Sequence, residues 1–237
     1  MSLPQLVSPE FTMEIPSTKQ KIKFRPFLVK EEKILLMAME SGDQSDVSRT
    51  VEQILGNCII DDVDVSKLAT FDIEYLFLQL RGKSVGEVIE LQLKHTKKDS
   101  ECKHVTQFNL NLDDIKVQGD ISDGKIMLDD KIGVKVNYPT YKTISDLSKR
   151  QVEDQTEMAF KTIALMVEYV YDKENVYSDF TEEEMEDWIN QLNQNQFEKI
   201  TNFVQNAPKL KQDIEWTCNK CGEKDKISLE GLQSFFT

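Results

Sequence analysis

Two cysteines near the C-terminus, Cys218 and Cys221, are separated by two residues and followed by Gly222. This spacing lets both thiolates reach one tetrahedral metal ion, and the glycine relieves the tight backbone turn behind them. The pair is therefore typical of a zinc knuckle. Because structural zinc takes four protein ligands, two more ligands must come from elsewhere in the chain.

Few other residues could supply them. Besides the knuckle, the cysteines and histidines of the chain are Cys58, His95, Cys102 and His104, and three of these four lie in one short segment. Aligning that segment with the knuckle places His95 opposite Cys218 and Cys102 opposite Cys221. We therefore expect a structural Zn²⁺ site with the ligands His95, Cys102, Cys218 and Cys221.

The first ligand has an alternative. His104 could replace His95, because a Cys-x-His chelate with Cys102 is sterically allowed although less common. Cys58 is excluded, since isoleucines and a leucine surround it in the sequence and this is the setting of a buried structural thiol.

Zinc is not the only use for such a cysteine pair. A redox dithiol usually opens a helix after a strand, whereas Cys218 and Cys221 lie between two segments that read as strands. A reduced, metal-free pair is the other alternative, and we favour zinc over both.

No catalytic residues emerge from the sequence. Both histidines lie in the candidate metal segment, and the chain has no nucleophile elbow, P-loop or dinucleotide fingerprint. A zinc ion with four protein ligands also has no open position for water or substrate. We expect a protein that is not an enzyme and that has no small-molecule substrate.

The elements that must position the ligands read as two hairpins. The segments EVIELQLKH (87–95) and HVTQFNLNL (104–112) alternate apolar and polar residues around a polar tip, and DIEWTCNKCGEKDKISLEG (213–231) repeats the strand–turn–strand pattern. We interpret them as a weak internal repeat, the two knuckles of one split zinc ribbon.

The rest of the chain alternates between strand and helix patterns. Residues 11–27 predict a two-stranded ribbon, the stretch from Val29 to Leu80 predicts three helices with Ser45 and Thr70 as caps of the second and third, and 125–138 predicts another hairpin. Further helices are expected over Leu147–Tyr171, from Thr181 through Leu192, and over 197–205.

These elements predict an α+β fold with a helical N-terminal half, C-terminal helices and β-hairpins. We divide the chain into residues 1–87 (ribbon and three helices), 88–140 (hairpins with the first knuckle), 141–210 (helical) and 211–237 (the C-terminal knuckle).

The net charge of the chain limits the classes of partner that it can bind. Acidic residues outnumber basic ones 42 to 29, for a formal net charge of -13, which repels phosphate backbones and anionic membranes. No apolar run approaches the roughly 18 residues of a membrane helix. The N-terminus lacks signal-peptide features, so we expect synthesis in the cytoplasm and no nucleic-acid or membrane partner.

Acidic residues are densest between Asp172 and Asp187. Carboxylates favour the first turn of a helix, so we interpret this stretch as a solvated helix start in preference to an acidic docking surface.

Two segments resemble a known family. They are FRPFLVKEEKILLMAMES (Phe24–Ser41) and LATFDIEYLFLQLRGKSVGE (Leu68–Glu87), which resemble the T4-like phage baseplate family of a hub subunit and a hub-assembly chaperone. The resemblance is specific over about residues 20–140, and the Tyr138–Tyr141 stretch and the terminal knuckle also fit it.

The resemblance implies a non-enzymatic protein at the centre of the baseplate. It would be built into the hub of the virion tail, in several copies and in contact with other hub and wedge proteins, or act as a transient assembly chaperone; we favour the first. Ser84 corresponds to the family's signature serine, which we expect to cap a turn. Relatives in this family carry cysteine at the first ligand position of the middle hairpin, where this chain has His95.

Overall fold

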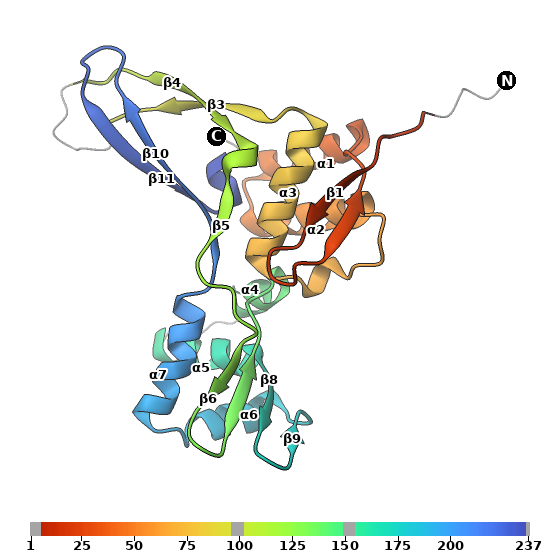
Figure 1. Ribbon diagram of the computed structural model, residues 1–237, viewed down its shortest axis with the longest axis vertical. Helices are drawn as coiled ribbons and strands as arrows, with labels where there is room; N and C mark the ends of the chain where they lie inside the picture. The colour runs from red at the N-terminus through yellow and green to blue at the C-terminus, as the bar shows by residue number, and fades with distance from the viewer. Residues whose placement is uncertain (1–5, 96–101, 149–154, 236–237) are drawn as a thin grey trace. The chain divides into compact units, whose positions relative to one another are not determined.

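The computed structural model describes residues 6–95, 102–148 and 155–235 (Figure 1). The chain forms two compact units, of which the first comprises Met1–Val65, Phe71–Gln118 and Lys209–Thr237, and the second Ser66–Thr70 and Gly119–Pro208. The first unit is therefore discontinuous in sequence, and the second is inserted between its parts. Across the described ranges, every helix is too short or too polar to span a bilayer.

The first unit begins with the ribbon and the three helices that the sequence predicts. Antiparallel strands β1 (Phe11–Glu14) and β2 (Lys21–Phe24) precede α1 (Val29–Ser41), α2 (Gln44–Cys58) and α3 (Thr70–Ser84), with the short 3-10 helix η1 (Val65–Lys67) before α3. Gly42 ends α1 in the left-handed conformation (φ 70°), which glycine adopts without steric cost.

Helix α3 is the centre of this unit. Eight of its residues are buried, among them Phe71, Ile73, Leu76, Phe77, Leu78 and Leu80. These side chains make α3 part of the core of the unit, in which Asp72 is buried as well. Side chains of α2 that are inaccessible to solvent, Val51, Ile54 and Leu55, contribute to the core of the same unit.

One predicted cap is wrong. Asp43, not Ser45, is the N-cap of α2, because its carboxylate accepts a hydrogen bond from the Ser45 N–H at 2.8 Å. Aspartate is at least as good a cap as serine, and here it comes first in the chain. Thr70, the other predicted cap, lies at the first position of α3 itself.

The remaining strands of the first unit form two hairpins. Strand β3 (Val88–Leu93) pairs with β4 (Thr106–Asn111), and β10 (Lys209–Thr217) pairs with β11 (Lys224–Glu230) on one side and β5 (Lys116–Gln118) on the other. The 3-10 helices η2 (Leu112–Asp114) and η3 (Leu232–Phe235) follow β4 and β11. Figure 1 shows the two hairpins running beside each other toward their tips. Both hairpins were predicted from the sequence.

The second unit is a four-stranded antiparallel sheet with helices. Its sheet order is β6 (Lys125–Met127), β7 (Gly133–Val136), β8 (Val167–Tyr171) and β9 (Val176–Tyr177), and its helices are α4 (Tyr141–Ser148), α5 (Gln155–Met166), α6 (Glu182–Ile189) and α7 (Gln194–Gln205). Its core joins Val134 and Val136 of the sheet to Ile163 of α5 and Ile200 of α7.

The long helix expected over Leu147–Tyr171 is wrong. Helix α5 ends at Met166, and Val167–Tyr171 is a strand between β7 and β9. The segment VEYVY is β-branched and aromatic at four of five positions, a composition that suits a pleated sheet. Part of the expected helix, residues 149–154, lies outside the described residues.

The observed fold therefore combines helices with several small antiparallel sheets, as the α+β prediction required. The split zinc ribbon and the division into four regions remain predictions.

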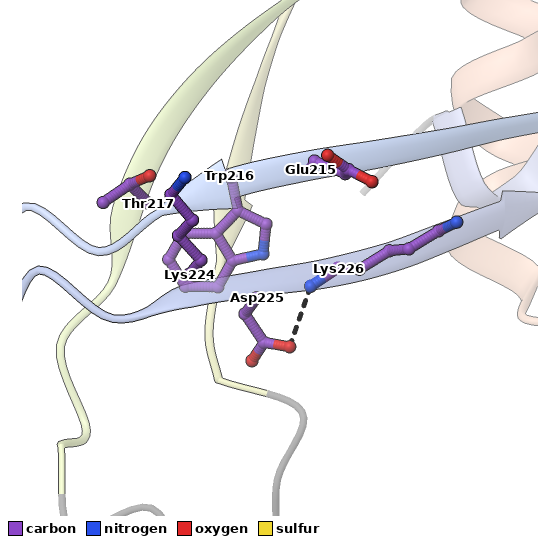
Figure 2. A pocket seen from close by; sticks show the side chains of 6 residues that line it. All are labelled: Glu215, Trp216, Thr217, Lys224, Asp225 and Lys226. Atoms are coloured by element: carbon purple, nitrogen blue, oxygen red, sulfur yellow. Dashed lines mark hydrogen bonds between the residues drawn. The ribbon is translucent and has the colours of Figure 1, made fainter.

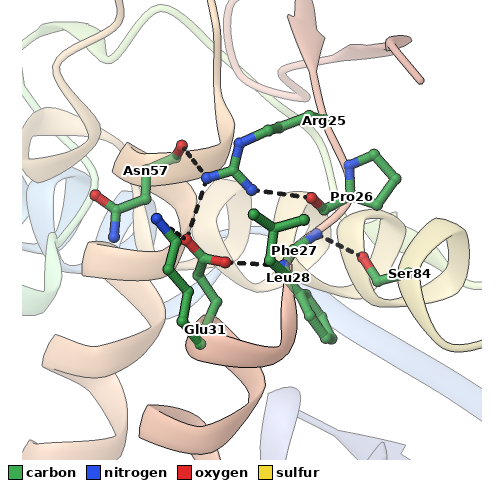
Figure 3. A network of polar contacts seen from close by, with 8 residues as sticks. Arg25, Pro26, Phe27, Leu28, Glu31, Asn57 and Ser84 are labelled. Atoms are coloured by element: carbon green, nitrogen blue, oxygen red, sulfur yellow. Dashed lines mark hydrogen bonds and ion pairs between the residues drawn. The ribbon is translucent and has the colours of Figure 1, made fainter. Parts of the chain in front are cut away.

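A buried ion pair ties β2 to α1 and α2 (Figure 3). The Arg25 guanidinium donates to Glu31 Oε1 at 3.1 Å and to the Asn57 carbonyl at 3.0 Å, while Glu31 Oε2 accepts from the Leu28 N–H at 2.8 Å. The Glu31 side chain is 1% exposed. Burial alone would raise its pKa, but the hydrogen bonds from Leu28 and Arg25 and the charges of Arg25 and Lys30 outweigh burial, so the pKa of Glu31 is lowered.

Ser84 also has a structural role. Its hydroxyl accepts a hydrogen bond from the Phe27 N–H at 3.0 Å (Figure 3). It also donates to the Leu80 carbonyl at 2.6 Å. It therefore fastens the segment between β2 and α1 to the end of α3, two parts of the chain that are far apart in sequence. The expected turn-capping role is replaced by a contact between segments.

Substituting Glu31 tests this network. Glu31→Ala should lower the free energy of unfolding by about 2–3 kcal/mol, because it leaves the partly buried Arg25 and the Leu28 N–H without their acceptor. Because the folded-state pKa of Glu31 lies below its unfolded value, its contribution is present above that unfolded value and is lost as pH falls through the folded pKa.

Denaturant titrations at neutral and acidic pH measure both effects. Exposed Glu32 lies next to Glu31 in the first turn of α1, and Glu32→Ala should cost no more than about 0.5 kcal/mol. Equal losses in the two variants, or a Glu31→Ala deficit that widens in acid, would contradict the assignment.

Candidate metal centre

The structure brings four cysteine and histidine side chains together at the tips of the two hairpins of the first unit. His95 follows β3, Cys102 precedes β4, Cys218 directly follows β10, and Cys221 lies in the turn before β11. One nitrogen or sulfur atom from each lies within 4.8 Å of the others. These are the four residues that the sequence nominated as ligands.

Their spacing fits a tetrahedral zinc ion. Cys102 Sγ and Cys218 Sγ are 3.9 Å apart, and Cys221 Sγ is 3.4 Å from His95 Nε2. With Zn–S bonds of about 2.3 Å and Zn–N bonds of about 2.0 Å, tetrahedral geometry separates two sulfurs by roughly 3.8 Å and a sulfur from a nitrogen by roughly 3.5 Å. The sulfurs are much too far apart for a disulfide, whose length is about 2.0 Å.

The turn of the knuckle is built by backbone hydrogen bonds. The Cys218 N–H donates to the Glu223 carbonyl, and the Gly222 N–H donates to the Cys218 carbonyl, both at 2.9 Å. Gly222 has φ 73°, a left-handed conformation in which any side chain would be strained. The glycine after the second cysteine is therefore required by the turn.

The same turn favours a thiolate at Cys218. Hydrogen bonds from the Cys221 and Lys220 N–H groups and from His95 lower the pKa of Cys218 to about 5, although the residue is only 1% exposed. The hydrogen bond from Glu223 favours the Cys221 thiolate, but burial and the neighbouring sulfurs of Cys218 and Cys102 raise the pKa of Cys221. Cys218 would therefore offer a thiolate to a cation.

Asp225 and Trp216 hold the His95 ring from outside the cluster. His95 directs Nε2 toward the sulfurs, while its Nδ1 lies 3.4 Å from Asp225 Oδ2, and the imidazole packs on Trp216 with ring centroids 5.2 Å apart. Trp216 and Asp225 are cross-strand partners in β10 and β11. Both line a cleft of about 610 Å³, and Figure 2 shows their side chains among those that line it. A carboxylate behind a ligating histidine sets the tautomer and orientation of the ring.

The sequence reasoning missed these two supporting residues. Both could have been found from the predicted hairpin, because Trp216 precedes Cys218 by two residues and so shares its face of the strand, and Asp225 lies opposite Trp216. Thr106 is a third such residue, since its hydroxyl accepts from the Asn219 N–H at 3.4 Å and joins β4 to the knuckle.

The two residues set aside at the sequence level lie elsewhere. His104, the alternative first ligand, is not part of the cluster. Cys58 is fully buried at the end of α2, and burial raises the pKa of its thiol to about 11. It is the structural thiol that its apolar neighbours predicted.

Three sulfurs and one imidazole nitrogen are the ligands that zinc prefers in structural sites. The four residues could therefore hold one Zn²⁺ in a closed shell, which would link the hairpins and leave no open position for catalysis. Cys102 and Cys218 are 116 residues apart in the chain, so such an ion would act as a staple across a long loop.

A comparison with protein families finds one match. A family model described as T4 bacteriophage base plate protein matches residues 8–237, which include both hairpins and both units. No curated protein sequence and no solved structure matches the chain.

Elemental analysis of the purified native protein tests the metal site. We expect about one zinc per chain, lost together with thermal stability in Cys102→Ser, Cys218→Ser and His95→Ala, because each removes one of four ligands. Cys58→Ser and His104→Ala are the matched controls, and both should keep the metal. Native protein without stoichiometric metal would refute the site, and loss of zinc in His104→Ala alone would refute the ligand assignment.

Substituting Asp225 tests whether its carboxylate supports His95. Asp225→Asn should weaken zinc binding by about 10- to 100-fold in competition with a chromophoric chelator, because the imidazole loses the acceptor that orients it. Glu215→Gln removes the same charge from an exposed position of the same hairpin, and its affinity should stay near that of the native protein. Equal effects would show that only net charge matters.

Proposed function

We propose, from the premise that this chain belongs to the T4 bacteriophage base plate protein family, that it is a non-enzymatic structural component of a contractile tail baseplate, in or at the central hub. The observation that carries the proposal is the family match over residues 8–237, because it covers almost the whole chain and both of its units. The family places the protein in a phage tail baseplate among other baseplate proteins. The hub position and a role in tail assembly through protein–protein contacts are the proposal.

The surface of the first unit supports a role in protein contacts. On α1, Val29, Leu36 and Met37 are each more than half exposed, and exposed apolar side chains gathered on one element are typical of interaction surfaces. Hub and wedge proteins of the baseplate are the proposed partners, several copies of the chain would be present, and synthesis would take place in the host cytoplasm.

The proposed zinc ion serves this role by rigidity. A closed metal shell would hold the two hairpins together through the assembly of a large particle without taking part in a reaction. Lys220, Lys224 and Lys226 of the knuckle alternate with Glu223 and Asp225, and Lys226 lies 3.5 Å from Asp213. This mixture of charges does not form the basic stripe that a nucleic-acid-binding ribbon needs.

The alternative function is that of a transient hub-assembly chaperone, absent from the mature virion. Quantitative mass spectrometry of purified, DNA-filled particles distinguishes the two, because a built-in subunit has a fixed ratio to other tail proteins. We expect a stoichiometric signal in these particles.

The same measurement on the lysate before particle purification shows that the protein is made and provides the control. A strong signal in the lysate together with none in the particles would refute the incorporated subunit and support the chaperone.

A further inference from the structure

The second unit contains a cavity of about 420 Å³ between the β8–β9 hairpin and α6. Its floor is apolar and belongs to the core of the unit, with Val170 8% and Met185 2% exposed. A cavity of this volume is within the range of sites that bind small groups or single side chains.

Aromatic rings form much of the wall. They are Tyr171, Tyr177, Phe180 and Trp188. Tyr177 lies at the end of β9, opposite Val170 in the sheet register, and is 50% exposed. Its hydroxyl donates to Asp172 Oδ2 at 2.9 Å, which fixes the position of the ring. The face of an aromatic ring attracts a cation.

Every charged residue among those that line the cavity is acidic. Asp172, Asp179 and Glu184 contribute. Asp172 also accepts hydrogen bonds from the Glu174 and Asn175 N–H groups, at 2.8 and 2.7 Å, which keep it ionised. Glu184 is engaged with the Thr181 N–H in the capping box of α6, at 2.7 Å. Asp179 is exposed and makes no hydrogen bond or ion pair with the described part of the chain.

The sequence around these residues adds further negative charge. From Glu174 to Glu198 the chain has eight acidic residues and no lysine, arginine or histidine, and Lys173, which directly precedes this stretch, is exposed and does not line the cavity. The apolar rim is open as well, with Ile132 37% exposed. Apolar rim, aromatic wall and unbalanced negative charge together suit a ligand with an apolar stem and a cationic head.

We propose that this cavity binds the side chain of an arginine on a partner protein, its guanidinium stacked on the aromatic wall and paired with Asp179. Arginine fits better than lysine because the guanidinium is planar, less strongly hydrated and able to stack on a ring while it donates to a carboxylate. Arginine and aromatic residues are also the side chains that contribute most to protein interfaces. That the partner is a baseplate protein rests on the proposed function, but the cavity and its chemistry do not.

The acidic residues between Asp172 and Asp187 then have two roles, one structural and one in binding. Glu184 completes the capping box at the start of α6, where the sequence predicted a helix start, whereas Asp172 and Asp179 line a cavity that the sequence pattern does not show.

Binding of a capped Gly-Arg-Gly peptide to the full-length protein tests the proposal. The indole N–H resonance of Trp188 is the readout, assigned with Trp188→Phe, since Trp216 is the only other tryptophan. The arginine peptide should shift this resonance in a saturable way at millimolar concentration, and its citrulline analogue, which has the same shape without the charge, should not. An equal response to citrulline, or none to arginine, would overturn the proposal.

Variants locate the site. Asp179→Asn and Tyr177→Ala should each weaken arginine-peptide binding by about three- to tenfold, because they remove the free carboxylate or one ring of the wall. Glu183→Gln is the matched control, an exposed acidic residue of α6 outside the cavity, and should leave binding unchanged. Circular dichroism confirms that each variant is folded.

Competing ligands decide the class of partner. Binding of a Gly-Lys-Gly peptide as tight as that of the arginine peptide would overturn the arginine assignment, and tighter binding of choline would overturn a protein partner in favour of a quaternary ammonium compound. Arginine selectivity in a protein that is absent from purified particles would keep this proposal while refuting the incorporated subunit.

Discussion

The first unit depends on the pairing of its C-terminal segment, which begins at Lys209, with a strand that lies before the longer part of the second unit in the sequence. Strand β10 pairs with β5 over Lys209–Lys211 and then carries Cys218 to within 3.9 Å of Cys102. Closing so long a loop has an entropic cost that grows only slowly with length, but it must be offset by local interactions. A two-stranded hairpin such as β3–β4 is marginally stable alone. The four candidate metal ligands lie at the tips of the two hairpins, where a bound ion would cross-link them.

The rest of the first unit is held by a different kind of interaction. Around α3 most of the core is apolar, although Asp72 and Glu31 are buried in it. Its polar contacts connect segments of the chain: Arg25 joins β2 to α1 and α2, and Ser84 fastens the entry of α1 to α3. These are also the segments whose sequences resemble the baseplate family. What looks in the sequence like a signature of function is, in the structure, a set of hydrogen bonds that orient helices.

The second unit has its own core, and acidic side chains are concentrated on one part of its surface. Its sheet and helices bury Val134, Val136 and Ile163 without any contribution from cysteine or histidine. Negative charge concentrated on α6 and the β8–β9 turn opposes association with acidic surfaces and favours basic ones. The insertion thus presents a different chemistry from the apolar α1 surface of the first unit, and two chemically distinct surfaces suit a protein that must contact more than one neighbour.

The sequence by itself determined the elements with strong local signals: the hairpins with their alternating residues, the helices around Phe71 and Thr181, and four ligand-type residues in two matched segments. It could not determine where Leu147–Tyr171 changes from helix to strand, because VEYVY has apolar residues compatible with both and only its pairing with β7 and β9 decides. Nor could it order Asp43 over Ser45 as a cap, since both have suitable side chains. The predicted hairpin pairs Asp225 with Trp216, but only the tertiary structure brought this pair against His95 of the other hairpin and gathered aromatic and acidic side chains around a cavity. These depend on strand register and on helix–sheet packing, which are non-local and therefore leave no local pattern in the chain.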